Sequence, residues 1–282
     1  MTSVLKFFQG RFGRVALLDS DHDLVTHAHP QCHVLIKADG DDTSFQVGER
    51  LHRLTRDSMI LVNAWEPHAK LHRDQRGRST VLALYIEPEW LAGLDSKLSV
   101  AGLRGFFSAP SVPIPADVRR HADRLIGEMY EGTPDAEREA KWESALFELM
   151  MSVIYAFSAW RQPREITRAN LRRPSDPRIN RAIRFMHENL GGFSFDEVAR
   201  HSHLSRPHFF YLFKHCMSLS PAIFLNALRM EAAFAQLTRP STAIITVAER
   251  LGFSEPHHFT RFFRHNLGIP PSEYRNTVEL FH

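Results

Sequence analysis

The sequence has few of the features that mark secreted, disulfide-bonded or membrane-spanning chains. It holds two cysteines among 282 residues, and Cys32 and Cys216 do not form a disulfide framework. The longest nearly continuous apolar run, Leu149 to Trp160, has 12 residues, whereas a membrane-spanning helix needs roughly 20. The segment from Met1 to Arg14 carries scattered basic residues and no apolar run followed by a cleavage site. These absences predict a cytoplasmic protein.

Positive charge is also scarce in the first part of the chain. The net charge of +3 is divided unevenly, because the segment from Arg161 onward has 17 Lys and Arg against 10 Asp and Glu. The C-terminal part therefore has a net charge of +7 and the first 160 residues a net charge of −4. This balance indicates a polyanion binder in the C-terminal part alone.

Short β-type runs and turn clusters dominate the first hundred residues. The β-type runs are 33–37, 45–47, 58–63 and 80–86. Their spacing predicts an antiparallel barrel or sandwich. From Pro115 the pattern becomes helical, with one helix over 116–131 and a second that starts near Pro134 and ends near Trp160. We therefore expect an α+β multidomain protein, with a β-barrel over 1–112 and a helical segment over 113–160.

The second of these helices is apolar on more than one side. One helical stripe consists of Trp142, Ala145, Leu146, Leu149, Val153, Phe157 and Trp160. A further apolar surface consists of Phe147, Met150, Met151, Ile154 and Tyr155. Such a helix needs more than one partner. It either packs on the barrel and on a second subunit of a homodimer, or makes all of its contacts within the chain.

The remainder of the chain predicts a linker followed by helices alone. Residues 161–177 contain three prolines, several arginines and little apolar periodicity, which is typical of a solvated linker. The segment 178–282 is expected to be all-α. The predicted helices are 178–190, 195–201, 206–216, 221–237, 243–250, 256–266 and a short one from about 271. Ser194 and Glu197 predict a capping box at the second of them.

One pattern occurs twice in this helical segment. The first copy runs from Val198 to Ser205 and the second from Val247 to Ser254, and each continues with His-Phe and Phe-Lys/Arg-His. The offset changes from 49 to 50 residues after the serine, so the second copy has one extra residue in its turn. A repeated unit of this size predicts two helix-turn-helix hairpins, at about 195–216 and 244–266. The alternative is a duplicated helical hairpin that binds no ligand.

The residue types in the repeat suit such hairpins. Leu204 and Phe253 are apolar residues in the turns, and Ser205 and Ser254 are candidate helix caps. The phenylalanines at 209 and 213, and those at 259 and 263, are spaced four apart and are expected to face the core. Lys214 and Arg264 occupy matching positions suited to phosphate contact.

The segment 178–276, and above all Ile245 to Arg275, resembles the AraC/XylS family of bacterial transcription regulators. The resemblance implies two helix-turn-helix subdomains joined by a long helix, here about 221–237. Both recognition helices would enter successive major grooves roughly 34 Å apart on one face of DNA. The residues expected to contact DNA are Arg206, Pro207, Phe210, Tyr211, Lys214, His257, His258, Arg261 and Arg264.

The two sets of expected base readers differ. Arg261 suits bidentate recognition of guanine, and His257 and His258 suit hydrogen bonding to base edges. The first set departs from the polar or basic residues usual in the family, because Phe210 and Tyr211 cannot form such a fork. Arg206 is one position away and would compensate. The alternative for Phe210 is a core aromatic.

The N-terminal part resembles the two cupin motifs over about Leu24 to Glu87, a domain that many AraC/XylS regulators use as an effector sensor. Its departures are His33 in place of a glutamate and Arg56-Asp57 in place of a Pro-Gly-Asp-like turn. The four motif histidines would ligate a divalent metal or line a polar pocket, and no cofactor is required. The expected effector-binding residues are His27, His29, His33, His68, Lys37, Trp65, His72 and Tyr85, and the metal candidates are the first four.

These features together favour an effector-responsive, DNA-binding transcription regulator that is not an enzyme. The expected partners are double-stranded DNA, a small-molecule effector, a second copy of the chain and, for an activator, RNA polymerase. Two alternatives stay open. One is a cupin metalloenzyme with an appended DNA-binding module, and the other is a constitutive regulator whose barrel only dimerises.

Overall fold

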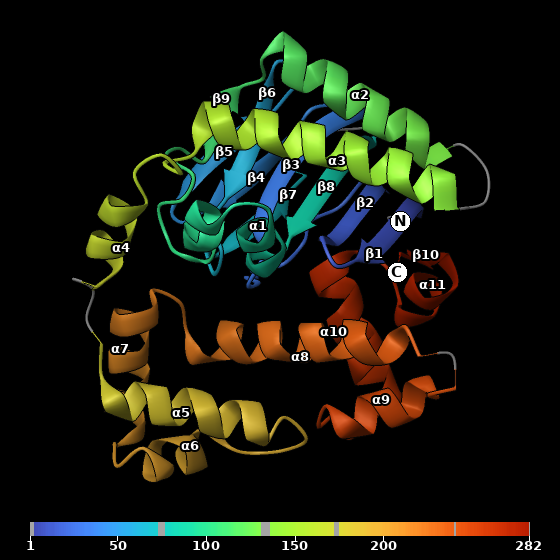
Figure 1. The fold of residues 1–282 in the computed structure, drawn as a ribbon. Helices are drawn as coiled ribbons and strands as arrows, with labels where there is room; N and C mark the ends of the chain where they lie inside the picture. The colour runs from blue at the N-terminus through green and yellow to red at the C-terminus, as the bar shows by residue number, and fades with distance from the viewer. Residues whose placement is uncertain (1–2, 73–76, 131–135, 172–174, 240, 282) are drawn as a thin grey trace.

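The computed structural model describes residues 3–72, 77–130, 136–171, 175–239 and 241–281. Figure 1 shows three layers. Helices α2 (Ala116–Tyr130) and α3 (Ala136–Phe157) cover one face of the β-strands, and the C-terminal helices lie across the opposite side. The predicted fold class, a β-rich N-terminal region followed by a helical one, is confirmed.

Most strands of the N-terminal region pair in an antiparallel manner. The strands are β1 (Ser3–Gly10), β2 (Gly13–Ser20), β3 (Cys32–Gly40), β4 (Thr43–Val47), β5 (Arg50–Leu54), β6 (Ser58–Val62), β7 (His68–Leu71), β8 (Ser79–Ile86) and β9 (Ser111–Pro113). One sheet has the order β10-β1-β2-β8-β3-β6-β9, in which β10 is Val278–Leu280, and the other has the order β5-β4-β7. The two sheets of the N-terminal region together are called the barrel. The short helix α1 (Pro88–Leu94) and a 3-10 segment, η1 (Ser96–Gly102), follow β8.

Alternate residues of the larger sheet belong to two different cores. In β8, Leu82 and Leu84 lie in the core shared with α2 and α3, whereas Ala83 and Tyr85 face the smaller sheet and the C-terminal helices. Successive side chains of a strand point to opposite faces, and here both faces are covered. The central strands therefore appear in the sequence as continuous apolar runs.

Helix α3 is buried against the sheet along most of its predicted stripe. Its fully covered side chains are Trp142, Ala145, Leu146, Leu149, Met150, Val153 and Ile154. A second stripe stays open, because Phe147 is 41% exposed, Tyr155 is 51% exposed and Met151, between them, is half-buried. These three residues are spaced four apart and share one side of the helix.

The predicted linker over 161–177 is wrong for most of its length. Helix α4 (Pro163–Leu171) occupies it, Ile166 is buried in the core of the N-terminal region, and Asn170 donates a hydrogen bond of 2.9 Å to the carbonyl of Arg104. Residues 172–174 lie outside the described residues. A single buried isoleucine among arginines gives no apolar period, so the sequence pattern did not reveal this helix.

The helices after residue 176 lie within two residues of their predicted bounds. They are α5 (Pro177–Glu188), α6 (Phe195–His201), α7 (Arg206–Met217), α8 (Pro221–Leu237), α9 (Ile244–Arg250), α10 (Pro256–Leu267) and α11 (Pro271–Thr277). The Ser194–Glu197 capping box of α6 is confirmed. The predicted cap position of α7 is confirmed, and that of α10 is wrong. Ser205 is the N-cap residue of α7 but makes no side-chain cap bond, and the extra residue in the second turn makes Glu255 the N-cap residue of α10.

The C-terminal region is not entirely helical. Residues Val278–Leu280 form β10, which pairs in parallel with β1 through the register Phe7 to Val278. The end of the chain thus extends the sheet of the N-terminal region, where β10 lies beside β1 (Figure 1). The expectation of an all-α segment over 178–282 is corrected in this respect.

Candidate functional site

The two helical hairpins, α6–α7 and α9–α10, repeat the same turn in atomic detail. His203 in the first turn and Gly252 in the second both have a left-handed backbone, with φ of 54° and 78°. The next residue of each turn donates to the supporting helix, from Leu204 to the carbonyl of Ala199 at 2.9 Å and from Phe253 to that of Ala248 at 3.0 Å. A glycine suits the second position because a Cβ there would approach the carbonyl oxygen of Gly191 at 2.8 Å.

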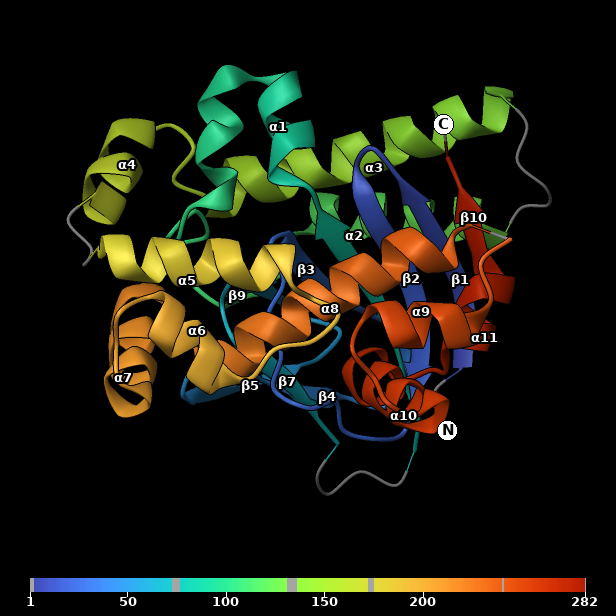
Figure 2. The same cartoon turned by 90° about the horizontal axis from the view of Figure 1, so that it is seen from below.

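Each recognition helix is held by the same aromatic pair. Phe209 and Phe213 of α7 and Phe259 and Phe263 of α10 are completely buried, as the four-residue spacing predicts. Helix α8 runs between the hairpins, with α7 near one end and α10 near the other (Figure 2). The side of α7 and α10 away from these phenylalanines is therefore free to meet a partner.

The residues predicted to contact DNA lie on this outer side. The exposed ones are Arg206, Pro207, Tyr211, Lys214, His257, His258, Arg261 and Arg264. Phe210 is half-buried, with its ring 5.2 Å from that of Phe195. Arg206 lies over the Phe210 ring at 5.8 Å and bonds Asp196 at 3.0 Å, so it is partly engaged within the hairpin.

The outer face of α10 has the more suitable chemistry for reading bases. The rings of His257 and His258 meet edge to face with centroids 4.2 Å apart, and the exposed Arg261 lies one turn further along the helix. An arginine in the major groove can bond both O6 and N7 of guanine. On α7 the exposed Tyr211 stacks on His215 instead, with an interplanar angle of 5°. This side offers stacking, methyl contact and phosphate contact.

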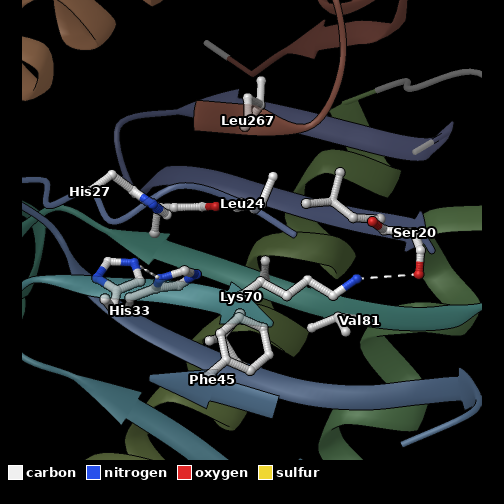
Figure 3. Close-up of a pocket in the computed structure, with 13 residues that line it drawn as sticks. Ser20, Leu24, His27, His33, Phe45, Lys70, Val81 and Leu267 are labelled. Atoms are coloured by element: carbon white, nitrogen blue, oxygen red, sulfur yellow. Dashed lines mark hydrogen bonds between the residues drawn. The ribbon is translucent and has the colours of Figure 1, made fainter. Parts of the chain in front are cut away.

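A pocket lies between the barrel and the end of α10 (Figure 3). Figure 3 shows His27 and His33 toward one end and Lys70 with Ser20 toward the other, while Leu267 of α10 contributes to the wall. The remaining wall is formed by Leu18, Leu24, Leu35, Phe45, His68, Val81, Ala83 and Tyr85. The space open to a water-sized molecule is about 30 Å³, so a ligand of more than a few atoms must displace part of the wall.

Four of the predicted barrel histidines form one cluster. Nε2 of His29 lies 3.2 Å from Nδ1 of His33, which lies 3.3 Å from Nε2 of His68. The rings of His27 and His68 are 4.3 Å apart. Burial lowers the pKa of all four imidazoles, and the neighbouring histidines lower those of His29 and His33 further. The cluster is therefore neutral near pH 7.

Of the other predicted effector residues, one lines the pocket and three do not. Tyr85 lines the pocket, and burial raises its pKa to about 12. Lys37 is paired with Asp42 at 2.7 Å and does not line it. Trp65 stacks on Phe224 of α8, and the backbone N–H of His72 donates to Asp23. Neither side chain lines the pocket.

Lys70 and Leu267 are among the pocket residues that sequence reasoning missed. Lys70 lies two residues after His68 on β7 and therefore shares its face, a signal that the sequence did contain. Its ammonium group donates to the carbonyl of Ser20 at 3.2 Å, and burial lowers its pKa to about 8. Leu267 comes from α10, and nothing in the sequence placed that helix against the barrel.

A polar group joins the barrel to α8 beside the pocket. Arg14 of β2 donates to both carboxylate oxygens of Glu231, at 2.7 and 2.9 Å, and to Gln31 at 3.1 Å. Gln31 in turn donates to Glu87 at 2.7 Å. Burial alone would lower the pKa of Arg14, but the Glu231 carboxylate raises it above its ordinary value. This junction is a charged pair in which the Arg14 side chain is 6% exposed and the Glu231 side chain 26% exposed.

Two family models match the chain, one on each side of this junction. An AraC-like ligand binding domain matches residues 16–154 and a helix-turn-helix domain matches residues 198–277. Together these segments cover more than three quarters of the sequence. The chain belongs to the AraC family of transcription regulators, as its C-terminal motifs indicated.

Among curated proteins, the chain is similar to the raffinose operon transcriptional regulatory protein RafR of Pediococcus pentosaceus, with 27% identity over 131 residues, 46% of each chain. It is also similar to the arabinose operon regulatory protein of Escherichia coli, with 29% identity over 117 residues, 41% of this chain and 40% of the relative. The chain spans less than half the length of the curated relatives that it matches.

Among solved structures, the fold is similar to that of ToxT from Vibrio cholerae strain SCE256 with a bound unsaturated fatty acid. The TM-score is 0.53 at 12% identity, and the match covers 93% of this chain and 94% of ToxT. This likeness concerns the fold. Of the described helices, none is both long and apolar enough to span a membrane.

Proposed function

We propose that the protein is a sequence-specific transcription regulator that binds double-stranded DNA through α7 and α10. The observation that supports this most directly is the repeated hairpin geometry, which exposes Arg261 and Lys214 on helices anchored by buried phenylalanine pairs. A helix so anchored, with basic residues outward, fits the major groove and its flanking phosphates. Such a regulator would act in the bacterial cytoplasm, where the chromosome lies.

The pocket beside α10 supports a response to a small-molecule effector. Its walls are mostly apolar, and Lys70 and Tyr85 supply a cation and a hydroxyl group. We infer an effector with an apolar body and one acidic or hydroxyl group. Because the wall includes Leu267, a ligand larger than the free space favours an arrangement in which α10 has shifted.

The site favours a regulator that catalyses no reaction over a metalloenzyme with an appended DNA-binding module. The described residues of the imidazole cluster include no carboxylate, whereas the metalloenzyme alternative expects a glutamate at the position of His33. The third candidate, constitutive DNA binding, predicts no ligand at all. A panel of small acids and phenols, screened by thermal shift on the wild type and on Lys70→Met, separates these readings. An effector would raise the melting temperature of the wild type and not of K70M, with exposed Lys97→Met as the matched control.

A homodimer through α3 is part of this proposal. The stripe of Phe147, Met151 and Tyr155 is the open side of a helix that is otherwise buried against the sheet. An identical stripe on a second copy would cover it about a two-fold axis. Two protomers would then present four recognition helices to one operator.

Selection of duplexes from a random DNA library tests DNA recognition itself. We expect an enriched motif whose half-sites are spaced by about one helical turn, or roughly 10 base pairs. The same motif should lie under the binding sites mapped across the source genome. Enrichment should be lost for Arg261→Ala and kept for Arg184→Ala, a variant of an exposed arginine on α5. Failure of the wild type to enrich any sequence would refute the proposed function.

A further inference from the structure

The imidazole cluster is arranged in a way that neither DNA binding nor the effector pocket requires. His27 and His29 lie in the segment before β3, His33 lies on β3 and His68 lies on β7. His27, His29 and His68 each offer one ring nitrogen, and these atoms lie within 4.8 Å of one another. His29, His33 and His68 are only 6%, 2% and 1% exposed. Three elements therefore bring three imidazoles to one point, with His27 half-buried, and His33 lies beside His29 and His68.

Backbone carbonyl groups fix the tautomers of three of these rings. Nδ1 of His27 lies 2.8 Å from the carbonyl oxygen of Val25, and Nδ1 of His68 lies 2.9 Å from that of Glu66. Nδ1 of His29 bonds the carbonyl oxygen of Gln31 at 3.1 Å. A carbonyl oxygen can only accept, so each neutral ring carries its proton on Nδ1 and a lone pair on Nε2. Carbonyl groups hold histidine ligands of metals in this way.

The fourth ring cannot satisfy the lone pairs that face it. Nδ1 of His33 lies within hydrogen-bond distance of Nε2 of both His29 and His68, yet one N–H can serve only one of them well. Nε2 of His33 is itself buried and has no hydrogen-bond partner among the described residues. In a buried site, opposed lone pairs are unfavourable unless a cation lies among them, and a cation bound at Nδ1 of His33 would leave its Nε2 without a partner as before.

We propose that the cluster binds a first-row divalent metal ion through Nε2 of His27, His29 and His68 and Nδ1 of His33. A metal–nitrogen distance of about 2.0–2.1 Å gives a separation of roughly 3.3–3.4 Å between tetrahedral ligands. The separations from His33 Nδ1, at 3.2 and 3.3 Å, are close to this value. In the metal-bound state His33 carries its proton on Nε2, so all four inward nitrogens are lone-pair donors.

The donor set and its surroundings define the class of metal. Four neutral imidazoles suit zinc, copper, nickel, cobalt or iron, whereas calcium and magnesium prefer oxygen ligands. Arg14, whose charge acts on His29 and His33, is paired with Glu231 at 2.7 Å, so its repulsion of a metal ion is reduced. The site holds no carboxylate ligand among the described residues, which distinguishes it from sites with three histidines and a glutamate.

Cobalt(II) titration of the chelator-treated full-length protein tests the site without DNA or effector. We expect binding of one cobalt ion per chain, with the visible absorption of a tetrahedral cobalt centre and a melting temperature that rises with metal concentration. Zinc should displace cobalt and abolish the absorption. Binding of less than a tenth of an equivalent, or a cobalt spectrum without ligand-field bands of imidazole coordination, would overturn the proposal.

Two variants and a control assign the ligands. His68→Gln and His33→Asn should each weaken cobalt binding by roughly 100-fold or more. Loss of a hydrogen-bond partner of a metal ligand already lowers metal affinity about 10- to 100-fold, and loss of the ligand itself should lower it at least as much. His215→Gln changes an exposed histidine on α7 and should bind cobalt as the wild type does. If one barrel variant does not fold, as judged by circular dichroism, the other still decides. Unchanged binding in either folded variant would refute this ligand set and leave the proposed DNA recognition untouched.

Discussion

Arg14 of β2 and Glu231 of α8 form a two-bond ion pair at 2.7 and 2.9 Å, although 217 positions separate them in the chain. The Arg14 side chain is 6% exposed and also lies 4.2 Å from the ring centre of Phe234. The barrel is thereby joined to the helix that connects both hairpins. Any movement of that helix away from the barrel must break this ion pair and separate Arg14 from the Phe234 ring.

Glu231→Gln should therefore weaken this junction. Loss of one partner of a buried pair destabilises by about 3 kcal/mol, because the remaining charge stays desolvated. We expect a lower denaturation midpoint and faster hydrogen exchange in β2 and α8. Lys6→Met is the matched control, since the more exposed pair of Lys6 with Glu279 also joins the two regions and contributes at most about 1 kcal/mol. Equal effects of the two variants would contradict the assignment.

Arg261→Ala should abolish specific DNA binding, whereas Tyr211→Ala should cost less. The arginine is exposed on α10 and suited to a bidentate contact with guanine, which contributes about 1–3 kcal/mol of discrimination. Tyr211 is 68% exposed and offers stacking or phosphate contact alone. Competition binding with the selected duplex and a scrambled one gives the ranking. The reverse order would show that α7, not α10, carries the specificity.

Stability of the metal-free protein should fall as the pH drops below about 6.5. Burial holds the pKa values of His29, His33 and His68 well below the ordinary value, so between these values and 6.5 only the unfolded chain binds the protons. Each such histidine reduces the free energy of unfolding by about 1.4 kcal/mol per pH unit. Urea denaturation between pH 7.5 and pH 5 with a chelator measures the slope. His33→Asn should make the slope shallower, and a flat wild-type profile would be inconsistent with neutral buried imidazoles.

Phe147→Glu should produce a monomer without loss of the fold. Its ring is 41% exposed on α3, so the change removes only part of a packed surface within the chain, but a carboxylate at a two-fold interface would be desolvated and face its symmetry mate. Light scattering after size-exclusion chromatography reports the mass. Glu143→Gln on the same helix serves as the control. A wild type that is already monomeric at micromolar concentration would exclude this interface.

The hairpins were predictable because their determinants are local. The capping residues Ser194 and Glu197, the glycine at 252 and the four-residue spacing of the phenylalanines act within one or two helical turns. The expected bounds of the helices from α5 to α11 were correct to within two residues for the same reason. Errors arose where one residue changed a local register, as at Ser254, or where a helix such as α4 is fixed by one buried residue.

The cluster of histidines was only partly predictable. The motif order of His27, His29, His33 and His68 indicated a common place in a barrel, but the orientation of each ring depends on carbonyl groups of Val25, Glu66 and Gln31. Lys37 and His72 have the same chemistry as the residues of the pocket, yet the structure turns them elsewhere.

The amino-acid sequence by itself determined the two hairpins, the basic character of the C-terminal region and its relationship to DNA-binding regulators. These properties follow from residue types at short, fixed spacings. The tertiary structure alone decided that α8, α10 and β10 lie against the barrel, that Leu267 closes the pocket and that Arg14 meets Glu231. Contacts across more than 200 positions leave no period in a sequence, since each depends on two complementary surfaces that form only after both regions have folded.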